Sequence, residues 1–194
     1  MNYPPLVSII IPAFNAQGTI GQTLDSAVSQ TWKNKEIIVI NDCSNDETLD
    51  VVKNYELFGV KIIDQPERRR TGSARNRGFI ESQGDYIQYL DADDVMSKNK
   101  IETQIKRLIN NGSNSSIATC QWALIYNNLK RMILKKDILW KDQSNIDFLY
   151  NMLRYGLMTP LMSYLIPRNL AEQAGRWDES LLMVEDPEYM CRVC

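Results

Sequence analysis

The segment with the clearest chemical potential is 91–94, which reads Asp-Ala-Asp-Asp and follows a short apolar run that ends at Leu90. A buried strand that ends in three carboxylates needs something to offset their charge. A divalent cation carrying a polyphosphate meets that need, because hard cations such as Mg²⁺ take carboxylate oxygens and substrate phosphates together. Asp91 and Asp93 alternate, so in an extended segment both side chains point to one side and can converge on one site. A solvated turn or a helix N-cap explains the same residues, since Asp is common in both.

Composition narrows the chemistry available to the chain. Its 194 residues are 44% hydrophobic and 24% charged, as in an ordinary globular protein that can bury a core. The net charge of −2 gives no bulk attraction for polyanions, so we expect no nucleic-acid partner. The chain has no histidine, which excludes Ser-His-Asp, Cys-His and His-metal chemistry. A general base must therefore be Asp, Glu, Lys, Tyr or Cys.

The cysteines and the apolar runs bear on location. The four cysteines lack zinc-site spacing, and the Cys191–Cys194 pair is a C-x-x-C without a second pair. This pattern favours a reducing compartment. No signal peptide is visible, and no apolar run approaches the ~20 residues that span a bilayer. We expect a cytoplasmic protein without a transmembrane segment, and leave open peripheral association with the inner face of the membrane.

Apolar runs and helical spacings alternate through the first half of the chain. Strands are expected at 7–11, where Pro12 should stop the strand, and at 36–40, 60–63 and 85–90. Helices are expected after Thr19, after a capping-box spacing of Ser44 and Glu47, at 74–82 and around 101–109. The second half is less regular, with strands expected at 117–126 and 131–134 and a helix at 146–153. This order predicts an α/β fold whose sheet is mostly parallel and flanked by helices.

Polar residues follow the ends of these strands. Asn15, Asp42, the arginine run 68–70 and the acidic segment 91–94 each come just after one strand. Ligands bind at the carboxyl ends of the strands in parallel sheets, so these residues should converge on one rim. This convergence favours a binding site over a simple turn at 91–94.

Five segments together resemble a family-2 glycosyltransferase of the GT-A type. They are 7–15 (Val-Ser-Ile-Ile-Ile-Pro-Ala-Phe-Asn), 40–46, 72–78 (Gly-Ser-Ala-Arg-Asn-Arg-Gly), 90–94 and 175–186, which includes Glu185-Asp186. They appear in the family's order and span nearly the whole chain. One D-x-D is a weak signal, whereas five ordered segments are a specific one.

The resemblance implies a Rossmann-like sheet and an activity. A sugar, most simply from a UDP-sugar, would move with inversion to the hydroxyl of a saccharide or lipid-linked saccharide, in polysaccharide or glycoconjugate synthesis. Mn²⁺ or Mg²⁺ would be the cofactor. Residues 1–95 would form the nucleotide-sugar-binding half, and 96–194 a smaller, mixed acceptor-binding half of the same domain, truncated at its C-terminus.

The resemblance also implies roles for single residues. Asp93 would bind the metal, Asp91 would lie by the ribose, Asp42 would accept a hydrogen bond from the uracil ring, and Asp186 would be the general base. The residues expected to bind the donor are Pro12, Ala13, Phe14, Asn15, Asp42, Arg70, Gly72, Asp91, Ala92 and Asp93. Arg75 and Asn76 match a family helix start that would stabilise the site rather than touch the donor.

The sequence departs from the family's common D-D-G-S at two positions. Asn41 stands for the first Asp and Cys43 for Gly. The cysteine matters only if its position needs a positive φ. Both departures leave the identity of the nucleobase open.

Two other functions remain compatible with the sequence. One is a nucleotide-sugar-binding domain without turnover. The other is a nucleotidyltransferase, although such an enzyme would carry a Gly-rich phosphate loop after the first strand, and segment 14–18 (Phe-Asn-Ala-Gln-Gly) is not one.

Overall fold

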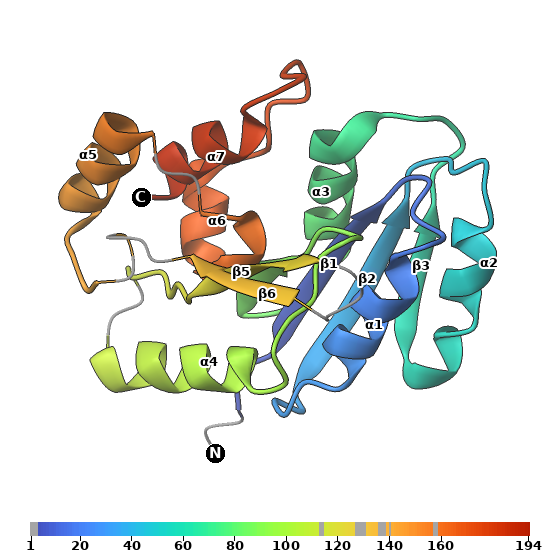
Figure 1. Cartoon of the computed structure of the whole chain (residues 1–194), viewed down its shortest axis with the longest axis horizontal. Coiled ribbons are helices and arrows are strands. Elements are labelled where there is room, and N and C mark those ends of the chain that lie inside the picture. Colours follow the sequence, from blue (N-terminus) through green and yellow to red (C-terminus); the bar gives the residue numbers. More distant parts are fainter. Residues whose placement is uncertain (1–3, 113–114, 127–130, 136–138, 140, 157–158) are drawn as a thin grey trace.

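The computed structural model describes residues 4–112, 115–126, 131–135, 139, 141–156 and 159–194 (Figure 1). A five-stranded sheet in the order β3-β2-β1-β4-β7 forms its centre. Strands β1 to β4 run parallel and β7 is antiparallel to β4, which confirms the predicted mostly parallel sheet. The strands are β1 Val7–Ala13, β2 Lys35–Asn41, β3 Val60–Asp64, β4 Tyr86–Tyr89 and β7 Ile166–Pro167.

Helices cover both faces of this sheet, and a separate hairpin lies beside it (Figure 1). The hairpin pairs β5 with β6 in antiparallel register. The helices and the hairpin strands are α1 Ile20–Val28, α2 Thr48–Lys53, α3 Arg70–Glu81, α4 Lys100–Asn111, β5 Trp122–Tyr126, β6 Arg131–Lys135, α5 Asn145–Tyr155, α6 Arg168–Ala174 and α7 Glu185–Val193, with short 3₁₀ turns at Glu56–Phe58 and Leu161–Ser163.

Two apolar cores lie on the two faces of the sheet. Successive residues of a strand point to opposite faces, so β1 contributes to both. Its Ile9 and Ile11 pack with residues of α1, α2 and α4, whereas Ile10 packs with the core that contains Trp177 and α7. Strand β1 is fully buried, which explains its nearly uninterrupted apolar sequence.

Pro12 does not stop the first strand, contrary to the prediction. Strand β1 continues to Ala13, and Pro12 pairs with Ile40 of β2. On the β2 side of β1, the Val7 N–H donates to the Asn34 carbonyl and the Ala13 carbonyl accepts from the Asp42 N–H. On the opposite side, the Ile10 carbonyl accepts from the Leu90 N–H. Pro12 shares the side of Ile10, beyond the last pair with β4, so its missing N–H leaves no ladder bond unmade.

Two helix starts also differ from the prediction. The Ser44 and Glu47 capping box does not form; α2 begins later, at Thr48, and the Ser44 hydroxyl donates to the side chain of Asn41. Helix α3 begins at Arg70 rather than near Ala74. Arg70 and Gly72 therefore belong to the first turns of a helix and not to a loop.

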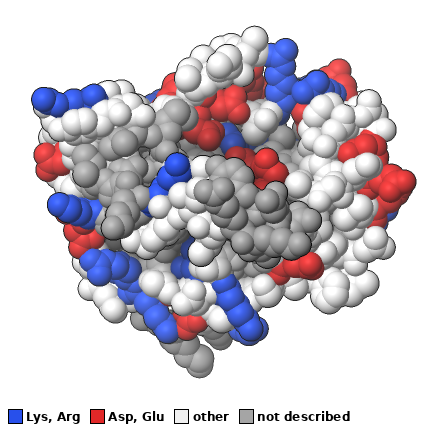
Figure 2. Space-filling model, viewed as in Figure 1, with Lys and Arg blue, Asp and Glu red and all other residues white. Residues whose placement is uncertain are grey.

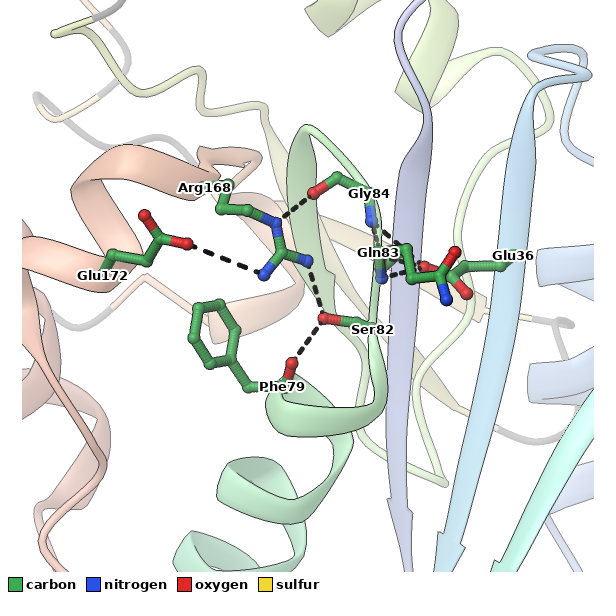
Figure 3. Close-up of polar contacts among 8 residues, drawn as sticks. Glu36, Phe79, Ser82, Gln83, Gly84, Arg168 and Glu172 are labelled. Carbon is green, nitrogen blue, oxygen red and sulfur yellow. Dashed lines mark hydrogen bonds and ion pairs between the residues drawn. The ribbon is translucent and has the colours of Figure 1, made fainter.

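The turn between α3 and β4 is fixed at the end of the sheet opposite the rim (Figure 3). The Glu36 carboxylate accepts from the backbone N–H of Gln83 at 2.6 Å and of Gly84 at 3.1 Å. The Arg168 guanidinium donates to the Gly84 carbonyl at 2.5 Å and to the Ser82 hydroxyl at 2.8 Å. These bonds hold β4 beside β1, and so fix where the acidic segment leaves the sheet.

Candidate active site

The turns after β1 and β2 are bonded to each other at the carboxyl end of the sheet. The Asn15 N–H donates to the Ser44 hydroxyl at 3.0 Å, and the Asn15 side-chain oxygen accepts from the Asn45 N–H at 2.9 Å. The Ala16 N–H likewise donates to the Thr48 hydroxyl at 2.7 Å. The two strand exits therefore form one continuous wall of the rim.

Asp42 organises the start of α3. It is only 3% exposed, and its carboxylate accepts from the N–H groups of Arg69 and Arg70, both at 2.7 Å, and from the Gln65 amide at 3.1 Å. Because the N-cap residue Arg69 supplies no side-chain cap, Asp42 takes over that task and satisfies two of the N–H groups at this helix end. Among the described residues, Oδ2 accepts only from Arg70, which leaves a lone pair for another donor.

Left-handed backbone is concentrated at this rim. The non-glycine residues with positive φ in the described part of the chain are Asn15, Cys43, Arg70 and Val184, with φ of 50°, 58°, 70° and 59°. Cys43 thus occupies a position that favours glycine, so its departure from the family pattern does matter for the backbone. Val184 is β-branched, which makes its left-handed conformation the most unusual of the four.

Phe14 and Arg68 form a stacked pair across the rim. The Arg68 guanidinium lies 3.8 Å from the centre of the Phe14 ring. The sequence predicts Arg70 as the donor contact from the arginine run, but the Arg70 side chain is exposed and its backbone N–H donates to Asp42. No spacing in the sequence distinguished Arg68, because the stacking depends on how β1 and the turn after β3 are placed.

The acidic segment forms a tight turn. The Asp94 N–H donates to the Asp91 carbonyl at 3.1 Å, and the Ala92 carbonyl accepts from the Thr23 hydroxyl of α1 at 2.9 Å. Asp93 is exposed and makes no hydrogen bond or ion pair with any residue that the structure describes. Its carboxylate is therefore available to a ligand.

Asp94 has a raised pKa. Burial, together with the nearby carboxylates of Asp91, Asp93 and Asp186, raises the pKa of Asp94 to about 7. Near neutral pH the Asp94 side chain is therefore partly protonated.

Arg75 joins the acidic turn to Glu185 and Asp186 at the start of α7. Its guanidinium is 2% exposed, and it contacts Asp91 at 2.8 Å, Asp186 at 2.6 Å and Glu185 at 3.6 Å. Burial opposes the charged form, but Asp91 and Asp186 more than offset it and raise the pKa of Arg75 above its ordinary value. A single buried cation thus fixes two carboxylates, 91 and 186, that are far apart in the sequence.

The neighbouring residue Asn76 holds the turn that precedes α7. Its side-chain oxygen accepts from the Trp177 N–H at 2.8 Å, and its amide donates to the Trp177 carbonyl at 3.0 Å and to Glu179 at 2.8 Å. The Trp177 ring then stacks on Tyr189 of α7 with centroids 3.9 Å apart. Gly72 is buried against the same turn, where an added Cβ would lie 3.6 Å from the Asp178 carbonyl oxygen.

The predicted site residues therefore fall into three settings. Asn15, Asp91 and Asp93 are at least partly exposed at the rim, whereas Pro12, Ala13, Asp42 and Gly72 are buried within or beneath it. Asp186 lies in the first turn of α7 and meets Asp91 through Arg75.

A hollow of about 2320 Å³ adjoins this rim. Asp93 and Asp94 line one part of it, and α4 and the β5–β6 hairpin line another. Figure 2 shows Asp and Glu gathered around a depression on this face of the molecule. Among the described residues, no group of three or more Asp, Glu or Cys side chains is arranged to hold a metal ion on its own.

The profile of "Glycosyl transferase family 2" matches residues 8–165. The chain belongs to this family. It is 37% identical over 185 residues to an uncharacterized glycosyltransferase of Rickettsia prowazekii, covering 95% of this chain and 57% of that one. It is also 34% identical over 123 residues, 63% of this chain and 48% of the other, to an Escherichia coli UDP-Glc:alpha-D-GlcNAc-diphosphoundecaprenol beta-1,3-glucosyltransferase. The chain thus spans about half the length of these family-2 relatives.

Solved structures confirm the GT-A fold expected of a family-2 chain. S. aureus TarS 1-349 in complex with UDP superposes with a TM-score of 0.77 at 19% identity, covering 95% of this chain and 53% of that one. A Pyrobaculum calidifontis mannosyltransferase in complex with GDP-Man and Mn²⁺ gives a TM-score of 0.67 at 19% identity, covering 92% and 49%. Within the described part of this chain, no helix has both the length and the apolar character that crossing a bilayer requires.

Proposed function

We propose that this chain forms the reaction centre of an inverting, metal-dependent glycosyltransferase that uses a UDP-sugar. The observation that carries the proposal is the buried Arg75, which holds Asp91 of the D-x-D and Asp186 of the Glu-Asp pair with one guanidinium. Inverting transfer needs a donor and an attacking hydroxyl on opposite sides of one carbon. A rigid link between a donor-side and an acceptor-side carboxylate supplies the necessary fixed separation.

On the donor side, the rim offers contacts suited to a nucleotide. Oδ2 of Asp42 has a lone pair for a ring N–H, and the Phe14 ring, stacked under Arg68, presents a flat apolar surface beside it. Pro12, Ala13, Asn15, Arg70 and Gly72 shape the backbone around this position, and Asp91 with Ala92 would lie by the ribose. UDP is bound by the TarS structure and named for the E. coli relative, which supports uracil as the base.

The oxygen chemistry at Asp93 fits Mn²⁺ or Mg²⁺. Its carboxylate is exposed and unpaired among the described residues, which suits a hard cation. One or two protein carboxylates suffice in such sites, because diphosphate oxygens and waters complete the shell. When bound, the ion supplies Lewis-acid stabilisation of the charge that develops on the departing nucleoside diphosphate.

Asp186 is the proposed general base. Its carboxylate lies at the N-terminal end of α7, is partly exposed, and accepts from Arg75 through Oδ1 only. Oδ2 remains to take the proton of the acceptor hydroxyl as that oxygen attacks the anomeric carbon. Such assistance is worth roughly 10²–10⁴-fold in rate. Arg75 positions this carboxylate and does not itself meet the substrate.

The acceptor is proposed to be a saccharide or a lipid-linked saccharide in polysaccharide or glycoconjugate synthesis. The E. coli relative is named for a diphosphoundecaprenol-linked acceptor, which supports the lipid-linked form. In this proposal, residues 1–95 bind the nucleotide sugar and residues 96–194 face the acceptor.

The function is tested by nucleoside diphosphate release from a panel of UDP-, GDP- and dTDP-sugars, with and without Mn²⁺ and with candidate acceptors. We expect UDP release that needs the metal and falls at least ~10²-fold in Asp186→Asn. Arg77→Gln, an exposed change on the outer side of α3, is the control and should retain turnover. Full turnover by Asp186→Asn would contradict the assigned base, and metal-independent release would contradict the role of Asp93.

A further inference from the structure

The β5–β6 hairpin exposes apolar side chains that nothing in the described chain covers. Met132 is 68% exposed and Leu134 is 50% exposed, and their neighbours Leu124, Ile125 and Ile133 are also exposed. A two-stranded ribbon is marginal in water by itself, so a surface that covers these side chains would stabilise it.

Positive charge is concentrated in the part of the sequence that contains α4 and the β5–β6 hairpin. Residues 98–142 contain nine Lys and Arg and three acidic residues, which gives this segment a net charge of +6 in a chain of net charge −2. Within it, Lys100 is buried, and Lys106 and Arg107 pair with Glu102 and Asp142. The remainder of the chain is therefore strongly acidic. Such a separation of charge indicates an anionic partner for this one region.

The structure brings the basic and the apolar side chains to one place. Lys98 and Lys141 line the large hollow together with Leu124, Met132 and Leu134. Both lysines are exposed, and neither forms an ion pair with a described residue. Figure 2 shows Lys and Arg gathered over α4 on this face, apart from the Asp and Glu around the depression.

We propose that this basic–apolar face, formed by Lys98, Lys141 and the exposed side chains of β5 and β6, docks on the surface of an anionic lipid bilayer. Apolar side chains enter the boundary between headgroups and acyl chains, and nearby lysines are attracted to anionic headgroups. A second copy of the chain is a poor occupant, because the exposed, unpaired Lys98 and Lys141 of one copy would face the same lysines of the other. The inference does not rest on the proposed function, since docking requires neither donor nor acceptor.

Docking of the hairpin would place the bilayer close to the acidic turn. The hollow that the face lines also reaches Asp93 and Asp94. A bilayer on the hairpin would therefore lie at one edge of the hollow whose other edge is the acidic turn. A substrate carried by a lipid would meet the rim without leaving the membrane surface.

Vesicle co-sedimentation tests the inference. We expect the protein to bind vesicles of phosphatidylcholine mixed with phosphatidylglycerol, to lose this binding as salt is raised, and not to bind pure phosphatidylcholine. The double variant Lys98→Glu/Lys141→Glu should bind at least about 30-fold more weakly, and Met132→Ser/Leu134→Ser about tenfold more weakly.

Matched variants control for charge and for apolar area. Lys33→Glu/Lys53→Glu makes the same change of charge, and Leu57→Ser/Ile80→Ser removes exposed apolar side chains elsewhere; both should bind as the unchanged protein does. Circular dichroism should show that all four variants are folded. Equal binding to neutral vesicles, no binding to anionic ones, or equal losses in test and control variants would overturn the inference. A concentration-dependent dimer abolished by Met132→Ser/Leu134→Ser would also overturn it, in favour of a second copy.

Discussion

At the scale of single residues, Arg75 explains why two acidic segments so distant in sequence lie close together. Removing its guanidinium leaves Asp91, Glu185 and Asp186 facing one another without a cation. We expect Arg75→Met to lower the free energy of unfolding by about 3 kcal/mol, the low end for a broken buried pair because the carboxylates are partly exposed. Urea denaturation measures this loss.

The control for Arg75 lies on the same helix. Arg77 pairs with Glu81 on the surface, so Arg77→Met should cost no more than about 1 kcal/mol. A positioning role further predicts that Arg75→Met lowers kcat more than it raises the KM for the donor. Equal stability of the two variants, or a loss confined to KM, would contradict the role given to Arg75.

Cys43 carries backbone strain that a glycine would relieve. Its φ is 58°, in the left-handed region that costs a non-glycine residue roughly 1–2 kcal/mol. Glycine would relieve this strain, but it also gives the unfolded chain greater conformational freedom, which offsets part of the relief. Cys43→Gly should therefore raise the free energy of unfolding by about 0.5–1 kcal/mol and raise Tm by about 2 °C. Cys43→Ser keeps the strain and should leave Tm unchanged. A drop in Tm for Cys43→Gly would show that the thiol has another structural role.

At the scale of the elements, α3 lies unusually close to β1. A Cβ added at Gly78 would fall 2.3 Å from Cγ2 of Ile10, whereas one added at Gly18 would meet nothing within 4 Å. Gly78→Ala should therefore destabilise by about 1–3 kcal/mol through overpacking. Gly18→Ala should be neutral or slightly stabilising. Thermal unfolding of both variants checks this contact, and a neutral Gly78→Ala would mean that α3 can move away from the sheet at little cost.

Buried Lys100 ties α4 to β4 and makes stability depend on pH. It donates to the side chains of Gln88 and Gln104, and burial lowers the pKa of Lys100 to about 8. Between that value and the ordinary pKa of 10.5, the unfolded state binds more protons than the folded state, so this residue's contribution to stability rises with pH. Relative to Lys100→Met, the protein should gain roughly 2 kcal/mol between pH 7.5 and 9.5. A difference that stays constant with pH would contradict the shifted pKa.

The elements also show what local sequence could predict. The central strands and α4 were predictable, because β1 and β2 are buried apolar runs and Gly112 ends α4 in a left-handed conformation. The start of α3 was not, because its cap comes from Asp42, in the turn after β2. Helix α6 and strand β7 were missed, since β7 has only two residues and its pairing with β4 is a tertiary contact.

At the scale of the whole molecule, the convergence of strand ends on one rim followed from the alternation of strands and helices. The contacts that make the rim a site did not. The Arg75 link to Asp186 spans 111 residues, and the Arg68–Phe14 stack joins two different strand exits. Both depend on how the chain after β7 and the turn after β3 pack against the sheet, which no local pattern encodes.

We propose that this rim binds a nucleoside diphosphate together with a metal held by Asp93, and that the nearby base Asp186 is not needed for this binding. Calorimetric titration of UDP, with and without Mn²⁺, tests it most directly. We predict that Mn²⁺ strengthens UDP binding at least about tenfold, that Asp93→Ala abolishes this gain, and that Asp186→Asn retains it. No UDP binding, or a gain from Mn²⁺ that survives in Asp93→Ala, would contradict a donor site with its metal at Asp93.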